Sequence, residues 1–431
     1  MINKDKIYSS KRQNFLIALC FIVYCSSYLG KYTFNASINS VINFYGVLED
    51  DAGLIGSTFF FAYGAGQIIN GILCRFYNKK YMLGFSLVLS TLINIAIYLG
   101  IPFNYIKYIW FVNGFSLSCL WSSIVLILSE SLAPKYFAKA VVILSFCTPL
   151  GTILAYAMSA LFVAVSSFKD AFLCGGIIML ICGLGWILAF DKATLNKNEQ
   201  AYYLNESTAQ SSEETDQTKP VVQTKIKRKV ASSVIVLVCI LGLFSVINYF
   251  MRDGLSTWVP KILKEGYELP ESVSIILTLV VPLLGALGAY LAVPASRKIK
   301  NPINLSAIFF LGEVVTVGLI ALSFRVNMWL VLALLGLVNL FAQAICNLFT
   351  SILPLTMRDK VNSGLLSGLL NGCGYIGATI STYGLGYLQT LNIGWVSIFI
   401  ILTACAIIPV VTSVGIIIAQ KIKRKKEERI I

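Results

Sequence analysis

The sequence predicts an all-α membrane protein in which twelve transmembrane helices form two pseudo-symmetric halves of six. Hydrophobic residues make up 57% of the 431-residue chain and charged residues only 13%, about half the charged share of an ordinary soluble domain. The apolar residues occur in runs of roughly 20, the length that an α-helix needs to cross a bilayer. A polar segment near the middle of the chain separates six such runs from six others.

The apolar runs are continuous rather than alternating, which favours helices over a transmembrane β-barrel. The first run follows a polar, basic N-terminus and is too long for the apolar core of a cleavable signal peptide, so it is interpreted as a span. The predicted spans are residues 14–42, 52–73, 80–101, 104–132, 138–165, 169–190, 232–258, 272–296, 303–324, 327–355, 363–389 and 393–419.

The positive charges predict the orientation of these spans. The chain has 34 Lys and Arg against 20 Asp and Glu, a net charge of +14. If the N-terminus is cytoplasmic, 27 of the 34 cations fall in cytoplasmic segments and five in outer loops. Because cytoplasmic loops of membrane proteins are enriched in Lys and Arg, we expect both termini in the cytoplasm of a cell's inner or plasma membrane. The charge is thereby explained without a nucleic-acid partner.

The polar central segment divides the chain into three parts. Its sequence, NKNEQAYYLNESTAQSSEETDQTKPVVQTKIKRK, is poor in large aliphatic residues and predicts a flexible cytoplasmic linker. We therefore expect an N-terminal six-helix half at 1–190, a linker at 191–230, and a C-terminal half with a basic tail at 231–431. Two six-span halves are the layout of many secondary transporters, which bind substrate at mid-membrane between the halves.

The composition and motifs of the chain argue against several functional classes. The eleven cysteines form no CxxC pair and the chain has no histidine, so no metal site and no cofactor is predicted. The sequence has no Walker A motif, which argues against an ATP-driven pump. No nucleophile–base pair is visible and the commonest general base is absent, so an enzyme is not expected.

Two cations remain inside predicted spans, and they occupy matching places in the two halves. Lys31 lies late in span 1 and Arg252 late in span 7. A charge within a span is energetically expensive and usually faces protein or a water-filled cavity. Each cation follows a tyrosine at helical spacing on a polar stripe. The stripes are Tyr24, Tyr28, Lys31 and Asn35 in span 1, and Ser245, Asn248, Tyr249, Arg252 and Ser256 in span 7.

Facing stripes of this kind would form a positive pocket that binds a small, plausibly divalent, anion. Arginine offers a planar fork for carboxylate or phosphate, and lysine offers a point charge. The alternatives for Lys31 are that it extends to the membrane interface or forms a structural ion pair. The alternatives for Arg252 are that it pairs with Asp253 or lies at the interface near the end of span 7. Glu313 in span 9 is either a proton-coupling carboxylate or, as we favour, a structural residue bonded to a neighbouring helix.

Short segments resemble one known family along nearly the whole chain. YCSSYLGKYTFNASI at 24–38, FFFAYGAGQIINGILCRFYNKK at 59–80, NYFMRDGLSTWVPKILKE at 248–265 and SGLLNGCGYIGATI at 367–380 resemble spans 1, 2, 7 and 11 of the organophosphate:phosphate antiporters. These are major facilitator superfamily members that include bacterial glycerol-3-phosphate and hexose-6-phosphate transporters. The resemblance implies the major facilitator fold.

The resemblance also implies roles for individual residues. Arg252 falls on the second phosphate-binding arginine of the family, and Lys31 falls on the first, where lysine keeps the charge but loses the bidentate geometry. Gln67 replaces a lysine and Thr148 a histidine of the glycerol-3-phosphate branch. The remaining implied pocket residues are Tyr24, Tyr28, Tyr249, Tyr375 and Trp121.

The loop between spans 2 and 3 departs from the superfamily pattern. It retains Gly71 and Asn78, but Arg75 stands where an aspartate is usual. Since that aspartate helps to hold one access state through charge contacts, we expect its loss to shift the conformational balance.

Together these observations predict a monomeric secondary transporter, embedded in the lipid bilayer, that exchanges a small organic anion for inorganic phosphate. The expected substrate is an organophosphate such as a sugar phosphate or glycerol phosphate. One alternative is proton-coupled symport of a carboxylate sugar or another organic anion, with Glu313 and Asp253 as the candidate couplers. A second alternative, less favoured, is a transporter-like sensor of sugar phosphates.

Overall fold

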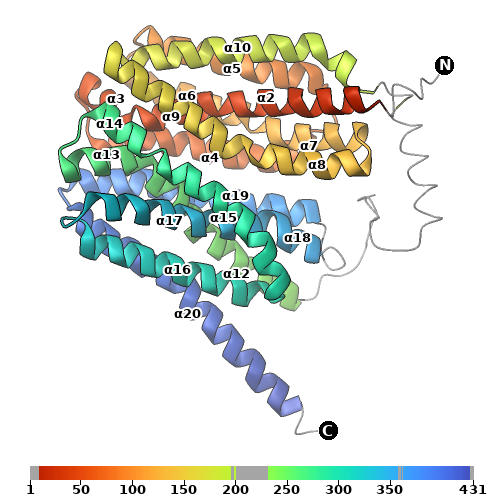
Figure 1. Cartoon of the computed structure of the whole chain (residues 1–431), viewed down its shortest axis with the longest axis vertical. Helices are drawn as coiled ribbons and strands as arrows, with labels where there is room; N and C mark the ends of the chain where they lie inside the picture. Colours follow the sequence, from red (N-terminus) through yellow and green to blue (C-terminus); the bar gives the residue numbers. More distant parts are fainter. Residues whose placement is uncertain (1–8, 196–198, 200–231, 358–360, 362, 428–431) are drawn as a thin grey trace.

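The structure, a computed structural model, describes residues 9–195, 199, 232–357, 361 and 363–427. Within these residues it is helical, without strands, and twelve helical rods lie side by side (Figure 1). Apart from residues 191–195 and 199, the predicted linker lies outside the described residues. Arg358, Lys360 and the last four residues of the predicted tail also lie outside them.

The N-terminal half contains six rods, three of which are interrupted by a short break. N-cap side chains of Ser9, Asn78 and Ser167 accept backbone hydrogen bonds at the starts of the first, third and sixth rods. The rods are α2 (Ser10–Ala36) with α3 (Ile38–Tyr45), α4 (Glu49–Leu73), α5 (Lys79–Tyr98), α6 (Phe103–Leu117) with α7 (Cys119–Ser131), α8 (Pro134–Ser145) with α9 (Cys147–Val165), and α10 (Phe168–Ala193).

The C-terminal half repeats this pattern, and two of its rods contain a π-helical turn. These turns are η1 (Phe250–Gly254) and η2 (Leu348–Ile352); such turns occur frequently at functional sites. The rods are α12 (Ser232–Tyr249) with η1 and α13 (Leu255–Tyr267), α14 (Glu271–Leu277) with α15 (Val280–Lys298), α16 (Pro302–Ser323), α17 (Met328–Asn347) with η2 and α18 (Leu353–Thr356), α19 (Ser363–Thr390), and α20 (Trp395–Glu427).

The predicted fold class is confirmed. Eleven of the rods among the described residues are long and apolar enough to cross a membrane, and α19, 28 residues rich in glycine, serine and threonine, is the twelfth. The predicted end of span 7 is wrong. The seventh rod continues to Tyr267 rather than ending at 258, because the charged side chains at its end form ion pairs within the protein. Lys261 and Lys264 therefore lie on its last turns and not in a loop.

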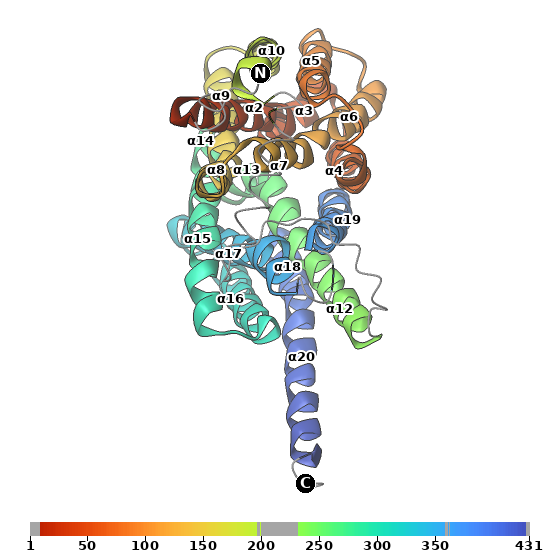
Figure 2. The ribbon, with the colours of Figure 1, turned by 90° about the vertical axis from the view of Figure 1, so that its right-hand side faces the viewer.

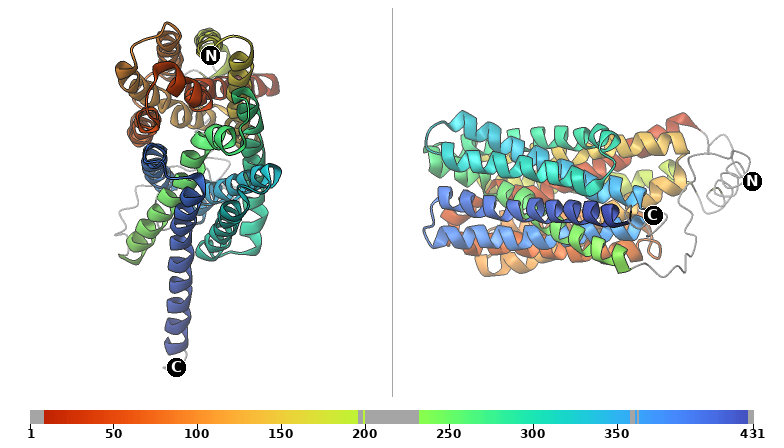
Figure 3. Two further views of the ribbon diagram at one scale, coloured as in Figure 1. Left: turned by 90° about the vertical axis from the view of Figure 1, so that its left-hand side faces the viewer. Right: turned by 90° about the horizontal axis from the view of Figure 1, so that it is seen from below.

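The two halves pack against each other along α4 and α19 on one side and along α9, α14 and α15 on the other (Figure 2). The left-hand view of Figure 3 shows that α20 extends away from the bundle at its C-terminal end. We call the end of the bundle that contains α3 and α14 the α3 end, and the opposite end, where α2 begins, the α2 end (Figure 1).

Polar contacts hold the halves together at the α3 end. Lys261, which is 6% exposed, donates to Glu49 of the other half at 3.0 Å and to Glu265 of its own helix at 2.6 Å. Asn35 donates to Thr257 across the interface at 3.0 Å. The halves are therefore closed together at the α3 end.

Close packing of α19 on α12 depends on Gly377. A Cβ atom at this position would lie 1.9 Å from the carbonyl oxygen of Val246, and a backbone atom cannot yield as a flexible side chain can. We expect Gly377→Ala to destabilise the protein by about 1–3 kcal/mol, measured as a lower thermal unfolding temperature in detergent. Gly384→Ala on the same helix is the matched control, because nothing lies within 4 Å of its Cβ position. Equal unfolding temperatures for the two variants would contradict this packing.

Candidate functional site

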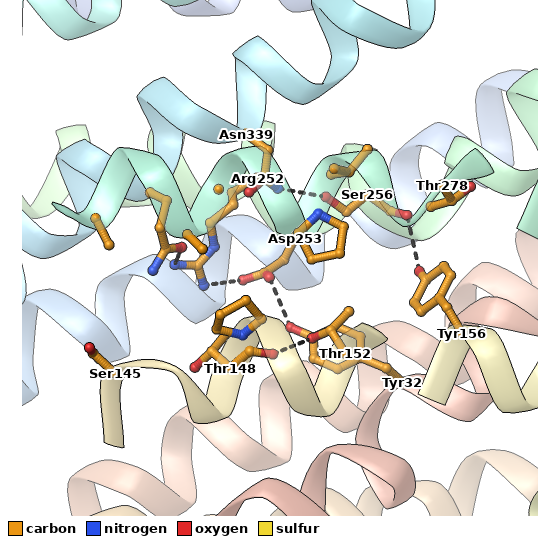
Figure 4. A pocket seen from close by; sticks show the side chains of 17 residues that line it. Tyr32, Ser145, Thr148, Thr152, Tyr156, Arg252, Asp253, Ser256, Thr278 and Asn339 are labelled. Carbon is orange, nitrogen blue, oxygen red and sulfur yellow. Dashed lines mark hydrogen bonds and ion pairs between the residues drawn. The ribbon is translucent and has the colours of Figure 1, made fainter. Parts of the chain in front are cut away.

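A pocket opens between the two halves, with Arg252 and Asp253 of η1 in its wall (Figure 4). The N-terminal half contributes hydroxyl groups from α2, α8 and α9. The C-terminal half contributes the hydroxyl groups of Ser256 and Thr278 and two amide groups from α17. Arg252 and Asp253 are the charged residues among those that line the pocket. The polar lining includes Tyr32, Thr148, Thr152, Tyr156, Ser256, Asn339 and Gln343.

Arg252 is held by three neighbours. Its guanidinium donates to the Asp253 carboxylate at 2.6 Å and to the Gln343 side-chain oxygen at 3.3 Å, and it lies 4.0 Å from the centre of the Tyr249 ring. Of the two alternatives for Arg252, the structure therefore shows the ion pair with Asp253. The pair nevertheless lies in the pocket wall, where an anion could replace the carboxylate.

Lys31 has no carboxylate partner. Its side chain is buried at 6% exposure, and its Nζ makes no ion pair in the part of the chain that the structure describes. Its hydrogen-bond acceptor is the Tyr375 hydroxyl of the other half, at 3.2 Å. Aromatic rings surround Nζ, and such cation–π contacts are each worth about 0.5–2 kcal/mol. The ring centres lie at 4.6 Å for Tyr63, 5.0 Å for Tyr32, 5.1 Å for Tyr375, 5.7 Å for Phe60 and 5.8 Å for Tyr28.

Tyr32 connects this aromatic cage to the pocket. One face of its ring contacts Lys31 Nζ, and its hydroxyl donates to Asp253 at 3.3 Å. Lys31 does not itself line the pocket. Counting Lys31, Arg252 and Asp253, the site has a net charge of +1 rather than the +2 that two uncompensated cations would give. Lys31 thus lies beside the pocket without a carboxylate partner in the described residues, whereas Arg252 lies in the pocket wall and is paired with Asp253.

The predicted tyrosines form one aromatic cluster across the interface. The Tyr28 ring packs edge-on against Tyr24 at 5.4 Å, and Tyr249 and Tyr375 pack in the same way at 5.2 Å. Trp121 lies 5.2 Å from Tyr24. The Tyr28 hydroxyl is bonded to Thr148 at 2.7 Å, so this position remains polar where the resemblance implies a histidine.

Gln67 takes part in a hydrogen-bond chain between the halves. The Tyr249 hydroxyl donates to Asn371, whose amide nitrogen in turn donates to the Gln67 side-chain oxygen. The structure thus brings together nine of the predicted pocket residues, in the pocket or in the cluster beside it: Tyr24, Tyr28, Lys31, Gln67, Trp121, Thr148, Tyr249, Arg252 and Tyr375.

Two predicted residues lie elsewhere. Asn35 is bonded to Thr257 at the closed α3 end and does not line the pocket. Glu313 is fully buried in α16, and neither carboxylate oxygen has a hydrogen-bond partner among the described residues. The bond to a neighbouring helix that we favoured for Glu313 is therefore not found among the described residues, and Glu313 does not line the pocket.

The pocket's amide groups and part of the cage around Lys31 are functional residues that the sequence patterns did not indicate. Tyr32 follows Lys31 directly and so lies off the stripe that the helical spacing selects, and Tyr63 lies on another helix. Asn339 and Gln343 are two members of an i, i+4, i+8 series on α17 that ends at Asn347. This periodicity in an otherwise apolar helix was the available signal.

Similar proteins with assigned names are membrane transporters and a related sensor. The chain is 22% identical over 406 residues to the "Probable hexose phosphate transport protein" of Chlamydia trachomatis, covering 91% of this chain and 88% of that protein. It is 24% identical over 111 residues to the "Membrane sensor protein UhpC" of Escherichia coli, covering 26% and 25% of the two chains.

Solved structures share the fold at low identity. A D-xylose-proton symporter matches with a TM-score of 0.69 at 12% identity, covering 92% of this chain and 95% of that one. A bacterial homologue of the human lysosomal transporter Spinster, in an inward-facing and occupied conformation, matches with a TM-score of 0.66 at 14% identity, over 94% and 93%. Residues 20–382 match the sequence profile of the Major Facilitator Superfamily. With this match over most of its length and twelve helices in two halves, the chain belongs to the Major Facilitator Superfamily.

Proposed function

We propose that this protein transports a hexose-phosphate-type organic anion across the cell membrane in exchange for inorganic phosphate. The observation behind this proposal is the buried ammonium group of Lys31, which has no carboxylate partner in the described residues and lies close to Arg252 between the halves. A charge buried in a membrane protein is stable only with a counter-charge or strong polar contacts. An anionic substrate would supply that counter-charge.

Phosphate fits this site better than a neutral sugar. Arginine binds phosphate oxygens with its planar fork and lysine adds a second positive charge. The names of the Chlamydia proteins, each 22% identical over about nine-tenths of this chain, support a hexose phosphate as the substrate. In our proposal the phosphate group replaces Asp253 at Arg252 and draws the Lys31 ammonium out of its aromatic cage.

Alternating access follows from how the halves pack. With the termini in the cytoplasm, as the charge distribution predicts, the closed α3 end faces outward and substrate enters this conformation from the cytoplasmic side. The bound anion offsets the positive charge of the site and so favours reorientation, whereas the empty site retains a net positive charge and crosses less readily. Such differential stabilisation of states couples uptake of one anion to release of another. One chain contains the whole site, which supports a monomer.

A ligand screen tests the proposed specificity. Purified protein in detergent is heated with glucose 6-phosphate, inorganic phosphate, glucose or gluconate, each at equal concentration. Because a ligand at about 100 times its Kd stabilises the folded state by about 2.7 kcal/mol, we expect glucose 6-phosphate and phosphate to raise the unfolding temperature and glucose to leave it unchanged. An equal effect of glucose would contradict a phosphate-binding site.

A second candidate is favoured by one observation, the carboxylate of Asp253 within the pocket. Proton-coupled symport of a carboxylate sugar would need such a titratable group near the substrate. In that case gluconate, and not phosphate, raises the unfolding temperature, and uptake of the carboxylate by vesicles is accompanied by alkalinisation outside. A sensor would instead bind hexose phosphate without moving it across the membrane.

A further inference from the structure

The pocket wall formed by the C-terminal half contains two amide side chains one helical turn apart. Asn339 and Gln343 both lie on α17 and both line the pocket. Residues at i and i+4 lie on the same face of a helix, separated by about 6 Å along its axis. In the described residues, Arg252 is the cation of this pocket and these amides extend its polar surface away from that charge.

Each amide has bonding capacity left over. Asn339 donates through its nitrogen to the Ser256 hydroxyl at 3.2 Å, and its carbonyl oxygen has no hydrogen-bond partner among the described residues. Gln343 accepts from Arg252 through its oxygen, and its nitrogen likewise has no partner there. Since polar groups inside a membrane protein are unfavourable unless bonded, these free donors and acceptors require water or ligand in the pocket.

We propose that Asn339 and Gln343 bind hydroxyl groups of the substrate, so that the site selects a polyhydroxylated sugar phosphate over inorganic phosphate alone. An amide offers a donor and an acceptor side by side, which matches sugar hydroxyls, each able both to donate and to accept. Two amides one turn apart can bind different hydroxyls of one ring while Arg252 binds the phosphate group. This inference rests on the proposed function and assigns the residues that recognise the sugar.

Gly285 of α15 leaves the space that this arrangement needs. A Cβ atom at position 285 would lie 2.1 Å from the Asn339 carbonyl oxygen, so any larger residue would push the amide aside. Gly285 also lines the pocket. Substitution at Gly285 therefore displaces the Asn339 amide without removing it, and provides a second way to test the same contact.

Equilibrium binding of glucose 6-phosphate and of inorganic phosphate, measured on purified full-length protein, tests this inference. We expect Asn339→Ala to weaken glucose 6-phosphate binding about tenfold, the effect of losing about one hydrogen bond, and to change phosphate binding less than twofold. Gly285→Ala is expected to give the same selective loss. Asn347→Ala is the matched control: Asn347 lies one turn further on the same face, donates to the Ala289 carbonyl at 2.7 Å and does not line the pocket.

The possible outcomes separate this inference from the proposed function. If the wild-type protein binds neither ligand, the proposed function fails. If it binds both, and folded Asn339→Ala or Gly285→Ala loses both equally or neither, only the assignment of the sugar contacts is overturned. A selective loss in Asn347→Ala as large as in Asn339→Ala would also overturn it. Size-exclusion chromatography identifies the folded variants, and if one of the two test variants fails to fold, the other decides.

Discussion

Arg252→Lys is expected to weaken binding of inorganic phosphate and of glucose 6-phosphate about 10- to 100-fold and to abolish exchange. Lysine retains the positive charge but lacks the planar fork with which arginine binds two oxygens at once. Hydrogen bonds to charged groups each contribute about 1.5–3 kcal/mol, which corresponds to this range of affinity. The shorter side chain also loses its contacts with Tyr249 and Gln343.

A matched control makes this result specific. Arg325, an exposed residue between α16 and α17, can be replaced by lysine with the same chemical change. Arg325→Lys should bind both ligands as the wild type does. Phosphate affinity that is unchanged in Arg252→Lys would show that the guanidinium does not hold the anion, and the proposed site would then be wrong.

Asp253→Asn is expected to bind phosphate about tenfold more tightly than the wild type. In the empty protein the Asp253 carboxylate occupies the guanidinium of Arg252 at 2.6 Å, so an incoming anion must displace it. Two unit charges about 4 Å apart interact by about 4 kcal/mol at an effective dielectric constant of 20, of which only part is recovered because asparagine still accepts a hydrogen bond from Arg252. The substitution is nearly isosteric, so it tests charge rather than packing.

The same substitution should slow transport when no counter-anion is present, although it strengthens phosphate binding. Without Asp253, the empty site changes from a net charge of +1 to +2, and moving it through the closed intermediate becomes less favourable. We expect the residual uptake into phosphate-free vesicles, expressed as a fraction of uptake into phosphate-loaded vesicles, to be lower in Asp253→Asn than in the wild type. Asp51→Asn, at an exposed position in the first turn of α4, is the control. Weaker phosphate binding in Asp253→Asn would indicate that Asp253 positions Arg252 and does not compete with the substrate.

Much of the fold could be predicted from the sequence because membrane spans are long, continuous and nearly uncharged. Because the spans carry so few charges, Lys31 and Arg252 could be recognised as exceptions within two spans. Their positions late in spans 1 and 7 correspond to each other in the two halves. The tyrosines preceding them could be recognised from helical spacing and from the resemblance. Each of these predictions depends on neighbours along one helix, which the sequence specifies directly.

The rest depends on packing between helices or on departures from regular geometry. Neighbouring residues on an α-helix do not face each other, so regular helix geometry does not predict the Arg252–Asp253 pair. The pair occurs within the π-helical turn η1. The cage around Lys31 combines rings from α2, α4 and α19. These rings cannot be predicted to surround Lys31 without knowing that α4 packs on α19. The amides of α17 were detectable as a periodic series, but only the pocket shows which of them face it.

Counterflow in reconstituted vesicles tests the central proposal most directly. Vesicles containing the purified wild-type protein are loaded with inorganic phosphate or with a phosphate-free buffer, and uptake of radiolabelled glucose 6-phosphate is followed over time. We predict rapid uptake that requires internal phosphate, is accompanied by phosphate release, and is absent with Arg252→Lys. Absence of uptake into phosphate-loaded vesicles, or uptake that is the same with and without internal phosphate, would contradict exchange of a hexose phosphate for phosphate.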